Sequence, residues 1–207
     1  MLVDLPVKDF IQEVAKDSPA PGGGSVAALA GAISAALVSM VANLTIGREK
    51  YKEQEEELII VREKAAVLQE KLTHIVDEDT QTFNLVMNAY KMPKTTEEEK
   101  TKRTQAIQEA LKRASELPME AAECSLEAMK LVKVVVEKGN PNCISDAGVG
   151  CLMAEAGLKG ALFNVEINIG SIKDEEFKNQ MQSKVEQLSQ EAQNLSKEII
   201  QMVKRQF

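Results

Sequence analysis

The chain has 207 residues, of which 44% are hydrophobic and 28% are charged, and its formal net charge is −7 at pH 7. This length allows one good core or two small ones, the composition is ordinary for a soluble globular protein, and the acidic balance argues against binding nucleic acid or an anionic membrane surface. Aromatic residues make up only 3%, with no Trp, so the core must be built from aliphatic side chains, which suits packed helices.

The first two predicted elements are helices. Asp4 is expected to cap a helix that runs to about Lys16, and a second helix is expected over about residues 25–47. The second helix carries no charge between Val26 and Ile46, but much of this stretch is Ala, Ser and Gly. It is weakly hydrophobic for its length, which favours a buried central helix over a membrane span.

The middle of the chain is also helical. A long amphipathic stretch over about residues 49–90 has apolar positions at helical spacing, and a Met-Pro pair stops it. The Thr-Thr-Glu-Glu-Glu run at 95–99 is typical of a capped helix start, and this helix should reach about Glu116. Pro118 is then expected to start or kink another helix, which runs to Lys138.

Two further helices complete the prediction. Gly139-Asn140-Pro141 is a strong stop, after which Ser145 or Asp146 is expected to cap a helix that runs to about residue 168. Ser171 or Asp174 leads into a last helix from Glu175. No strand pattern, repeat or linker interrupts the chain. Residues 1–207 are therefore predicted to form a single all-α domain, a bundle around a central Ala/Gly-rich helix.

Small residues form stripes on two of these helices, which predicts close helix packing. The stripes comprise Ala28, Ala32, Ala35, Ala36 and Ser39 on one helix, and Gly150, Ala154, Gly157 and Ala161 on the other.

The cysteines and the N-terminus indicate a reducing compartment. The chain has an odd number of cysteines, Cys124, Cys143 and Cys151, and no two of them form a Cys-x-x-Cys pair. Neither a disulfide framework nor a zinc site is therefore expected. The single histidine, His74, has no second ligand at metal spacing. The N-terminus lacks an apolar signal core, and we expect a cytoplasmic protein with no metal and no cofactor.

A proline- and glycine-rich loop before the second helix is the most informative motif. Pro21, Gly22, Gly23, Gly24 and Ser25 follow one another directly. Such a loop can bring bare backbone N–H groups to a helix N-terminus, where an anionic or polar ligand group can bind. It is not a nucleotide P-loop, because no Lys follows Gly24 and no strand precedes it. A plain turn is the alternative reading.

Further polar groups stand where a core-building chain would not place them. Asp79 lies near the apolar stripe of the long helix, Asn142 and Asp146 lie in a loop entering a helix, and Asn164 and Asn168 are one turn apart on an apolar helix. Each has a structural alternative: a solvated face for Asp79, an ordinary N-cap for Asp146, and a bridge between helices for Asn164. A buried Asn still needs partners, which a ligand can supply.

Taken together, these segments resemble the formiminotetrahydrofolate cyclodeaminase / methenyltetrahydrofolate cyclohydrolase family, over roughly residues 5–176. The matching pieces are Pro19-Ala20-Pro21-Gly22-Gly23-Gly24-Ser25, Leu44-Thr45-Ile46-Gly47 with Lys50-Tyr51, Asp77-Glu78-Asp79 with Phe83, Met92-Pro93-Lys94, Gly139-Asn140, Ser145-Asp146-Ala147-Gly148-Val149 and Asn164-Val165-Glu166-Ile167-Asn168.

The resemblance implies an all-α fold that dimerises, with folate bound near the subunit interface. It implies work on the carbon that bridges N5 and N10 of tetrahydrofolate. One family reaction closes 5-formiminotetrahydrofolate to 5,10-methenyltetrahydrofolate with loss of ammonia, and the other hydrolyses the methenyl compound to 10-formyltetrahydrofolate. The chain has no room for the formiminotransferase that accompanies the larger animal cyclodeaminases.

The residues at hand suit this chemistry, because a carboxylate can stabilise a cationic amidine-type carbon and move protons. Asp79 and Asp146 are the candidate catalytic acids and bases, with Glu166 as a further acid if neither serves. The candidate substrate-binding residues are the loop Pro21, Gly22, Gly23, Gly24 and Ser25, the amides Asn142, Asn164 and Asn168 for the pterin, and the cations Arg48, Lys50 and Lys94 for the glutamate tail.

Cyclodeaminase is the expected activity and cyclohydrolase the alternative, because the sequence does not separate ammonia release from hydrolysis. The alternative from another class is a non-catalytic helical oligomerisation module, which would have no reason to bury Asp79 beside the glycine loop.

Overall fold

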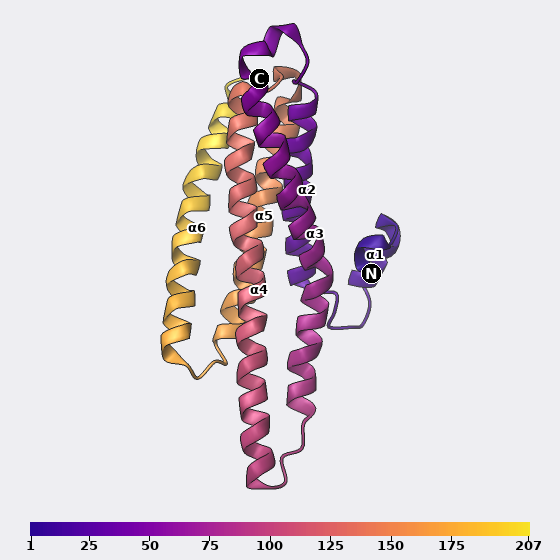
Figure 1. Cartoon of the computed structure of the whole chain (residues 1–207), viewed down its shortest axis with the longest axis vertical. Coiled ribbons are helices and arrows are strands. Elements are labelled where there is room, and N and C mark those ends of the chain that lie inside the picture. Colours follow the sequence, from indigo (N-terminus) through magenta and orange to yellow (C-terminus); the bar gives the residue numbers. More distant parts are fainter.

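The computed structural model describes residues 1–207, and it is all-helical, as predicted. Its α-helices are α1 (Val7–Val14), α2 (Gly23–Asn43), α3 (Glu55–Lys91), α4 (Glu97–Lys138), α5 (Ile144–Ile169) and α6 (Glu175–Lys204), and its 3-10 helices are η1 (Leu2–Asp4), η2 (Glu49–Gln54) and η3 (Pro141–Cys143). Helices α2 to α6 run side by side in an elongated bundle, while α1 stands beside it (Figure 1). The turn that joins α3 to α4 projects beyond the other helices.

Helix α2 is the centre of the bundle, where it packs against α3, α4 and α5. By length and composition it could cross a membrane, yet 56% of its most apolar stretch is buried inside the bundle. The small-residue stripes do allow close packing: a Cβ on Gly157 of α5 would lie 2.8 Å from the Ala27 carbonyl oxygen of α2, and one on Gly31 would meet Ser125 of α4. The close approach of α2, α4 and α5 therefore depends on residues without bulky side chains.

Several predicted helix ends are confirmed. Thr96 and Glu99 form a reciprocal capping box at the start of α4. The side chain of Asp174 accepts a hydrogen bond from the Phe177 N–H and caps α6. Gly139 ends α4, directly before η3.

Three expectations about helix ends were wrong. Asp4 lies in η1 and does not cap α1, whose N-cap is Pro6. Helix α4 does not end near Glu116 and Pro118 does not start a new helix, because α4 is continuous from Glu97 to Lys138 and burial among the other helices offsets the loss of one backbone hydrogen bond. Neither Ser145 nor Asp146 caps α5, which begins at Ile144 because η3 leads the chain into the helix two residues earlier.

Candidate functional site

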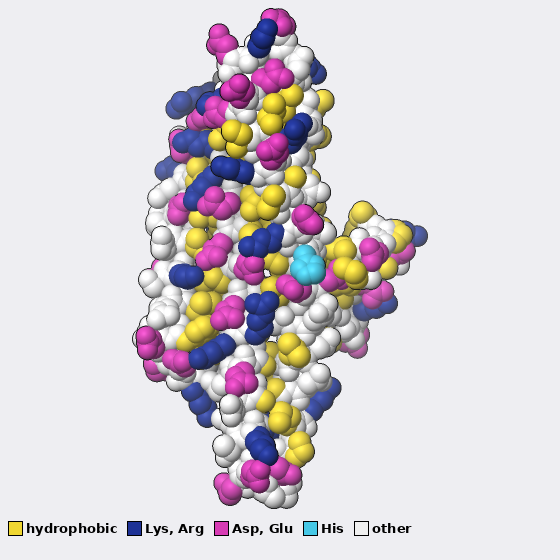
Figure 2. All heavy atoms as spheres, in the orientation of Figure 1, with side chains coloured by type: hydrophobic (Ala, Val, Ile, Leu, Met, Phe, Trp, Pro, Cys, Tyr) yellow, Lys and Arg dark blue, Asp and Glu magenta, His cyan; other side chains and the backbone are white.

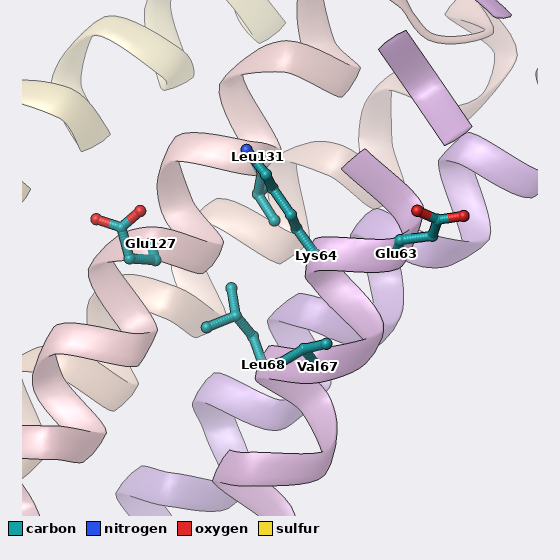
Figure 3. A pocket seen from close by; sticks show the side chains of 6 residues that line it. All are labelled: Glu63, Lys64, Val67, Leu68, Glu127 and Leu131. Atoms are coloured by element: carbon teal, nitrogen blue, oxygen red, sulfur yellow. The ribbon is translucent and has the colours of Figure 1, made fainter. Parts of the chain in front are cut away.

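Two hollows on the bundle differ in their chemistry. A groove of about 420 Å³ lies between α3 and α4 and is lined by Glu63, Lys64, Val67, Leu68, Glu127 and Leu131. Figure 3 shows Glu63 and Glu127 on opposite sides of this groove, far from one another. The face of the molecule seen in Figure 2 likewise carries charged side chains of both signs, interspersed with apolar ones. Nothing in the groove converges on a ligand.

The second hollow, of about 300 Å³, lies where α2 begins. Ligand sites typically combine apolar walls with a few convergent polar groups, and this pocket has both. Its lining comprises the backbone of Gly22, Gly23 and Gly24, the side chains of Asp79, Thr82, Phe83 and Val86 from α3, of Ala114, Leu117 and Pro118 from α4, and of Asn164, Ile167 and Asn168 from α5.

Asp79 joins α3 to the N-terminus of α2. The backbone N–H and the hydroxyl of Ser25 both donate to Asp79 Oδ2, at 2.8 and 2.9 Å. Helix α2 has no cap from its own N-cap residue, Gly22, and no acid in its first turn, so Asp79 supplies the negative charge that a helix N-terminus favours. Both bonds use Oδ2, which leaves Oδ1 without a protein partner.

The glycine loop keeps its backbone open to the pocket. The N–H groups of Gly23 and Gly24 have no acceptor within the chain. A Cβ on Gly24 would lie 2.6 Å from Asp79 Cγ, whereas one on Gly23 would have only Asn164 Nδ2, at 3.7 Å, within reach. A residue without a side chain is therefore required at position 24 for Asp79 to reach the N-terminus of α2. At position 23 a small side chain would still fit beside the pocket.

Asp79 is the one titratable side chain in the pocket lining. Burial raises its pKa above the ordinary value for aspartate, and the two hydrogen bonds from Ser25 act in the opposite direction. A half-buried carboxyl with a raised pKa in a largely apolar pocket is typical of a group that exchanges protons during a reaction.

The two asparagines of α5 reach the same pocket. Asn164 Nδ2 donates to the Gly160 carbonyl at 2.8 Å, and Asn168 Nδ2 donates across to the Ala114 carbonyl of α4 at 2.6 Å. Six of the residues predicted as site residues thus line one pocket: Gly22, Gly23, Gly24, Asp79, Asn164 and Asn168. Ser25 does not line the pocket but is hydrogen-bonded to Asp79, which does. Pro21 is buried and does not line the pocket either.

The other predicted site residues lie elsewhere in the chain. Asp146 is eighteen residues before Asn164 on α5, about 27 Å away along the helix. Arg48 and Lys50 follow the far end of α2, and Asn142 lies in η3 at that same end. Lys94 lies in the projecting α3–α4 turn, more than twelve residues beyond Asp79 and at least about 18 Å from it along α3. None of these five side chains lines the Asp79 pocket.

The pocket also contains residues that were not predicted as site residues. Thr82, Phe83 and Val86 lie three, four and seven positions after Asp79, so they share its face of α3, and helical spacing could have identified them. Ala114, Leu117 and Pro118 belong to α4, and nothing local in the sequence connects them with the glycine loop.

Comparisons with known proteins extend over nearly the whole chain. Residues 6–204 match the family described as formiminotransferase-cyclodeaminase. The chain is 44% identical over 198 residues to a methenyltetrahydrofolate cyclohydrolase of Methylorubrum extorquens, covering 96% of this chain and 95% of the relative. It is 37% identical to the formimidoyltransferase-cyclodeaminase of Rattus norvegicus, covering 92% of this chain but only 35% of that longer protein. A crystal structure of formiminotetrahydrofolate cyclodeaminase from Thermotoga maritima superposes with a TM-score of 0.89 at 29% identity, over 99% of this chain and 98% of that one.

Proposed function

Because the chain belongs to the formiminotransferase-cyclodeaminase family, whose named members act in folate one-carbon metabolism, we propose that it is an enzyme acting on the carbon that bridges N5 and N10 of tetrahydrofolate. The observation that carries this proposal is the position of the Asp79 carboxyl and its contacts. Its carboxyl is held at the N-terminus of α2, with Oδ1 free, in an apolar pocket beside two unpaired backbone N–H groups.

The preferred reaction is hydrolysis of 5,10-methenyltetrahydrofolate to 10-formyltetrahydrofolate. Ionised Asp79 stabilises the cationic carbon and takes a proton from water as the water oxygen bonds to that carbon. The N–H groups of Gly23 and Gly24 can hold the oxygen of the adduct. The bond from carbon to N5 then breaks, Asp79 returns its proton to N5, and the hydroxyl proton leaves to solvent. This route requires no cofactor besides the folate substrate.

Two observations favour hydrolysis over ammonia release. Hydrolysis needs a single base, and Asp79 is the single titratable group in the pocket lining. The relative that matches almost end to end, at 44% identity, is named as a cyclohydrolase. Cyclisation of 5-formiminotetrahydrofolate, the activity expected first above, is the second candidate, because the superposed Thermotoga maritima structure is named as a cyclodeaminase.

One assay separates these reactions. The purified chain is incubated with 5,10-methenyltetrahydrofolate and, separately, with 5-formiminotetrahydrofolate, and the methenyl absorbance is followed. We expect the absorbance to vanish with the first substrate faster than in buffer. Its appearance with the second substrate, together with ammonia, would establish the cyclodeaminase instead. No change with either would contradict the proposed function.

The pH dependence of kcat/KM should report the pKa of Asp79 and the effect of Ser25 on that pKa. The base must be ionised, so kcat/KM should fall as the pH drops through the raised pKa of Asp79. Ser25→Ala removes a hydrogen bond that stabilises the carboxylate, so this pKa should rise further and the acidic limb of the pH–rate profile should move to higher pH. Ser34→Ala, which removes a buried hydroxyl of α2 with no hydrogen-bond partner, is the control. An unshifted limb in Ser25→Ala would contradict this assignment.

We also propose that the enzyme is a homodimer paired through α2 and α5. Helix α2 is apolar around its whole circumference, which is typical of a helix covered on all sides. Its exposed residues Val26, Ile33 and Leu44 recur at helical spacing, and α5 packs beside it. The exposed apolar residues of α5 continue this surface: Val149, Leu152, Phe163 and Ile167. Ile167 is 76% exposed and also lines the Asp79 pocket, so the apolar face reaches the pocket rim.

An antiparallel pairing would explain the separated site residues. Residue 155 lies midway between Asp146 and Asn164, so a two-fold axis there would set the partner subunit's Asp146 level with Asn164. Arg48 and Lys50 of the partner would arrive at the same end, where the glutamate tail of a folate could meet them. The pocket volume of about 300 Å³ is at the small end for ligand sites, so part of the folate must lie outside it.

Sedimentation should show a dimer, and Phe163→Glu should shift it toward monomer, because each charge would be buried at the interface. A control of similar exposure on the other face is Val67→Glu, on α3, which should leave the dimer intact. If Asp146→Asn is also inactive, a partner that completes the site would explain it, and mixing Asp79→Asn with Asp146→Asn subunits should then restore activity, since each heterodimer keeps one intact site. A monomeric wild type would remove this proposal.

A further inference from the structure

We propose that Pro118 fixes the orientation of the Asn168 side chain, so that the amide oxygen of Asn168 faces the pocket as a hydrogen-bond acceptor. The pocket would then select a ligand whose ring carries N–H donors on the edge that faces Asn168. Pro118 is a positioning residue here, since it acts through Asn168. The identification of that ring as the pterin of a folate rests on the proposed function.

Pro118 removes a hydrogen bond at the wall of the pocket. In an α-helix the N–H of each residue donates to the carbonyl four residues earlier, and proline has no N–H. The carbonyl of Ala114 therefore has no helical donor, although α4 is otherwise continuous. Ala114 is only 7% exposed, so bulk water cannot readily replace that donor.

Asn168 supplies the missing donor from the neighbouring helix. Its Nδ2 lies 2.6 Å from the Ala114 oxygen. Ala114, Pro118 and Asn168 all line the pocket, so this bond joins its α4 and α5 walls. The amide cannot rotate by half a turn without placing its own oxygen against that carbonyl. The freed carbonyl consequently fixes the orientation of Asn168.

With Nδ2 engaged, Asn168 presents Oδ1 as a hydrogen-bond acceptor. Asn164, one helical turn earlier, is oriented in the same sense because its Nδ2 donates to the Gly160 carbonyl at 2.8 Å. Neither Oδ1 atom accepts a hydrogen bond from the protein. The pocket therefore offers two oriented acceptors about one turn apart, which suit adjacent N–H donors on one edge of a planar ring. The pterin ring has such an edge in its 2-amino group and neighbouring ring N–H.

A double-mutant cycle on thermal stability tests the pairing without any ligand. Asn168→Ala should lower the Tm of the otherwise wild-type protein by about 5 °C, because the Ala114 carbonyl is left unpaired. In a Pro118→Ala background the new N–H serves that carbonyl, so Asn168→Ala should lower Tm by less than about a third of that amount. Equal losses in the two backgrounds would overturn the pairing.

Ligand discrimination tests the consequence for recognition. Equilibrium binding of 5-formyltetrahydrofolate is compared with that of its 2-desamino-2-methyl analogue, which lacks the amino donor. The wild type should prefer the parent compound by at least about tenfold, since a site built to accept a hydrogen bond rejects an analogue without the donor. In Pro118→Ala the amide is released, and the preference should fall several-fold. A purely structural role for Pro118 would leave the preference unchanged.

These two measurements separate the inference from the proposed function. If the wild type binds neither folate, the proposed function and the donor-edge recognition both fail, while the stability cycle still decides whether Pro118 and Asn168 are paired. If folate binds but Pro118→Ala keeps the wild-type preference, the inference fails and the proposed function stands.

Discussion

Replacing Asp79 by asparagine is expected to lower kcat by about 100- to 10,000-fold while the protein still binds folate. The substitution keeps the shape of the side chain and an oxygen that can accept from the Ser25 N–H, so the N-terminus of α2 keeps a cap. It removes the only titratable group in the pocket lining, and with it the base for water and the acid for N5. The measurement is the loss of methenyl absorbance at saturating substrate, with binding followed separately.

The matched control is Glu78→Gln, one residue away on α3. Glu78 pairs with His74 at 3.3 Å and does not line the pocket, so its amide variant should keep near-normal turnover. Asp79→Asn with normal turnover would show that the carboxyl is not catalytic. Proton transfer would then rest with another acid, such as the partner subunit's Asp146.

Gly24→Ala is expected to reduce kcat/KM by about 100-fold, because the reactive carboxyl must move. The added Cβ would lie 2.6 Å from Asp79 Cγ, closer than non-bonded carbons approach, so Asp79 has to leave its hydrogen bonds with Ser25. A displacement of about 1 Å in a catalytic group can cost that factor in rate. Overpacking of this kind also costs about 1–3 kcal/mol of stability, so turnover is measured below the new Tm.

Gly23→Ala tests the same chemical change at the neighbouring position. Its Cβ would have only Asn164 Nδ2 nearby, at 3.7 Å, which is an ordinary contact, and neither glycine has a positive φ. We expect it to fold and turn over nearly as the wild type does, whereas the larger Gly23→Val should weaken folate binding by filling the pocket side of the loop. Equal activity in Gly24→Ala and Gly23→Ala would show that the close approach of Gly24 to Asp79 does not matter for the reaction.

Local patterns in the sequence were sufficient to predict the helices and part of the site. Apolar spacing, the Thr96–Glu99 capping box and the break at Gly139 depend on residues within one or two turns, and the structure has them as expected. The glycine loop and Asp79 were also recognisable, because bare backbone before a helix and a carboxylate beside an apolar stripe are unusual in a core-building chain.

Only the tertiary structure decided what those groups do together. It placed Asp79 of α3 as the cap of α2, a contact between residues 54 positions apart that no local pattern encodes. It put Asp146 about 27 Å from Asn164, because a continuous α5 holds its two ends apart. It kept α4 continuous through Pro118, where Asn168 of α5 donates a hydrogen bond to the carbonyl that proline leaves free. Helices form from nearby residues, but a pocket between four helices forms from side chains that meet only when the bundle packs.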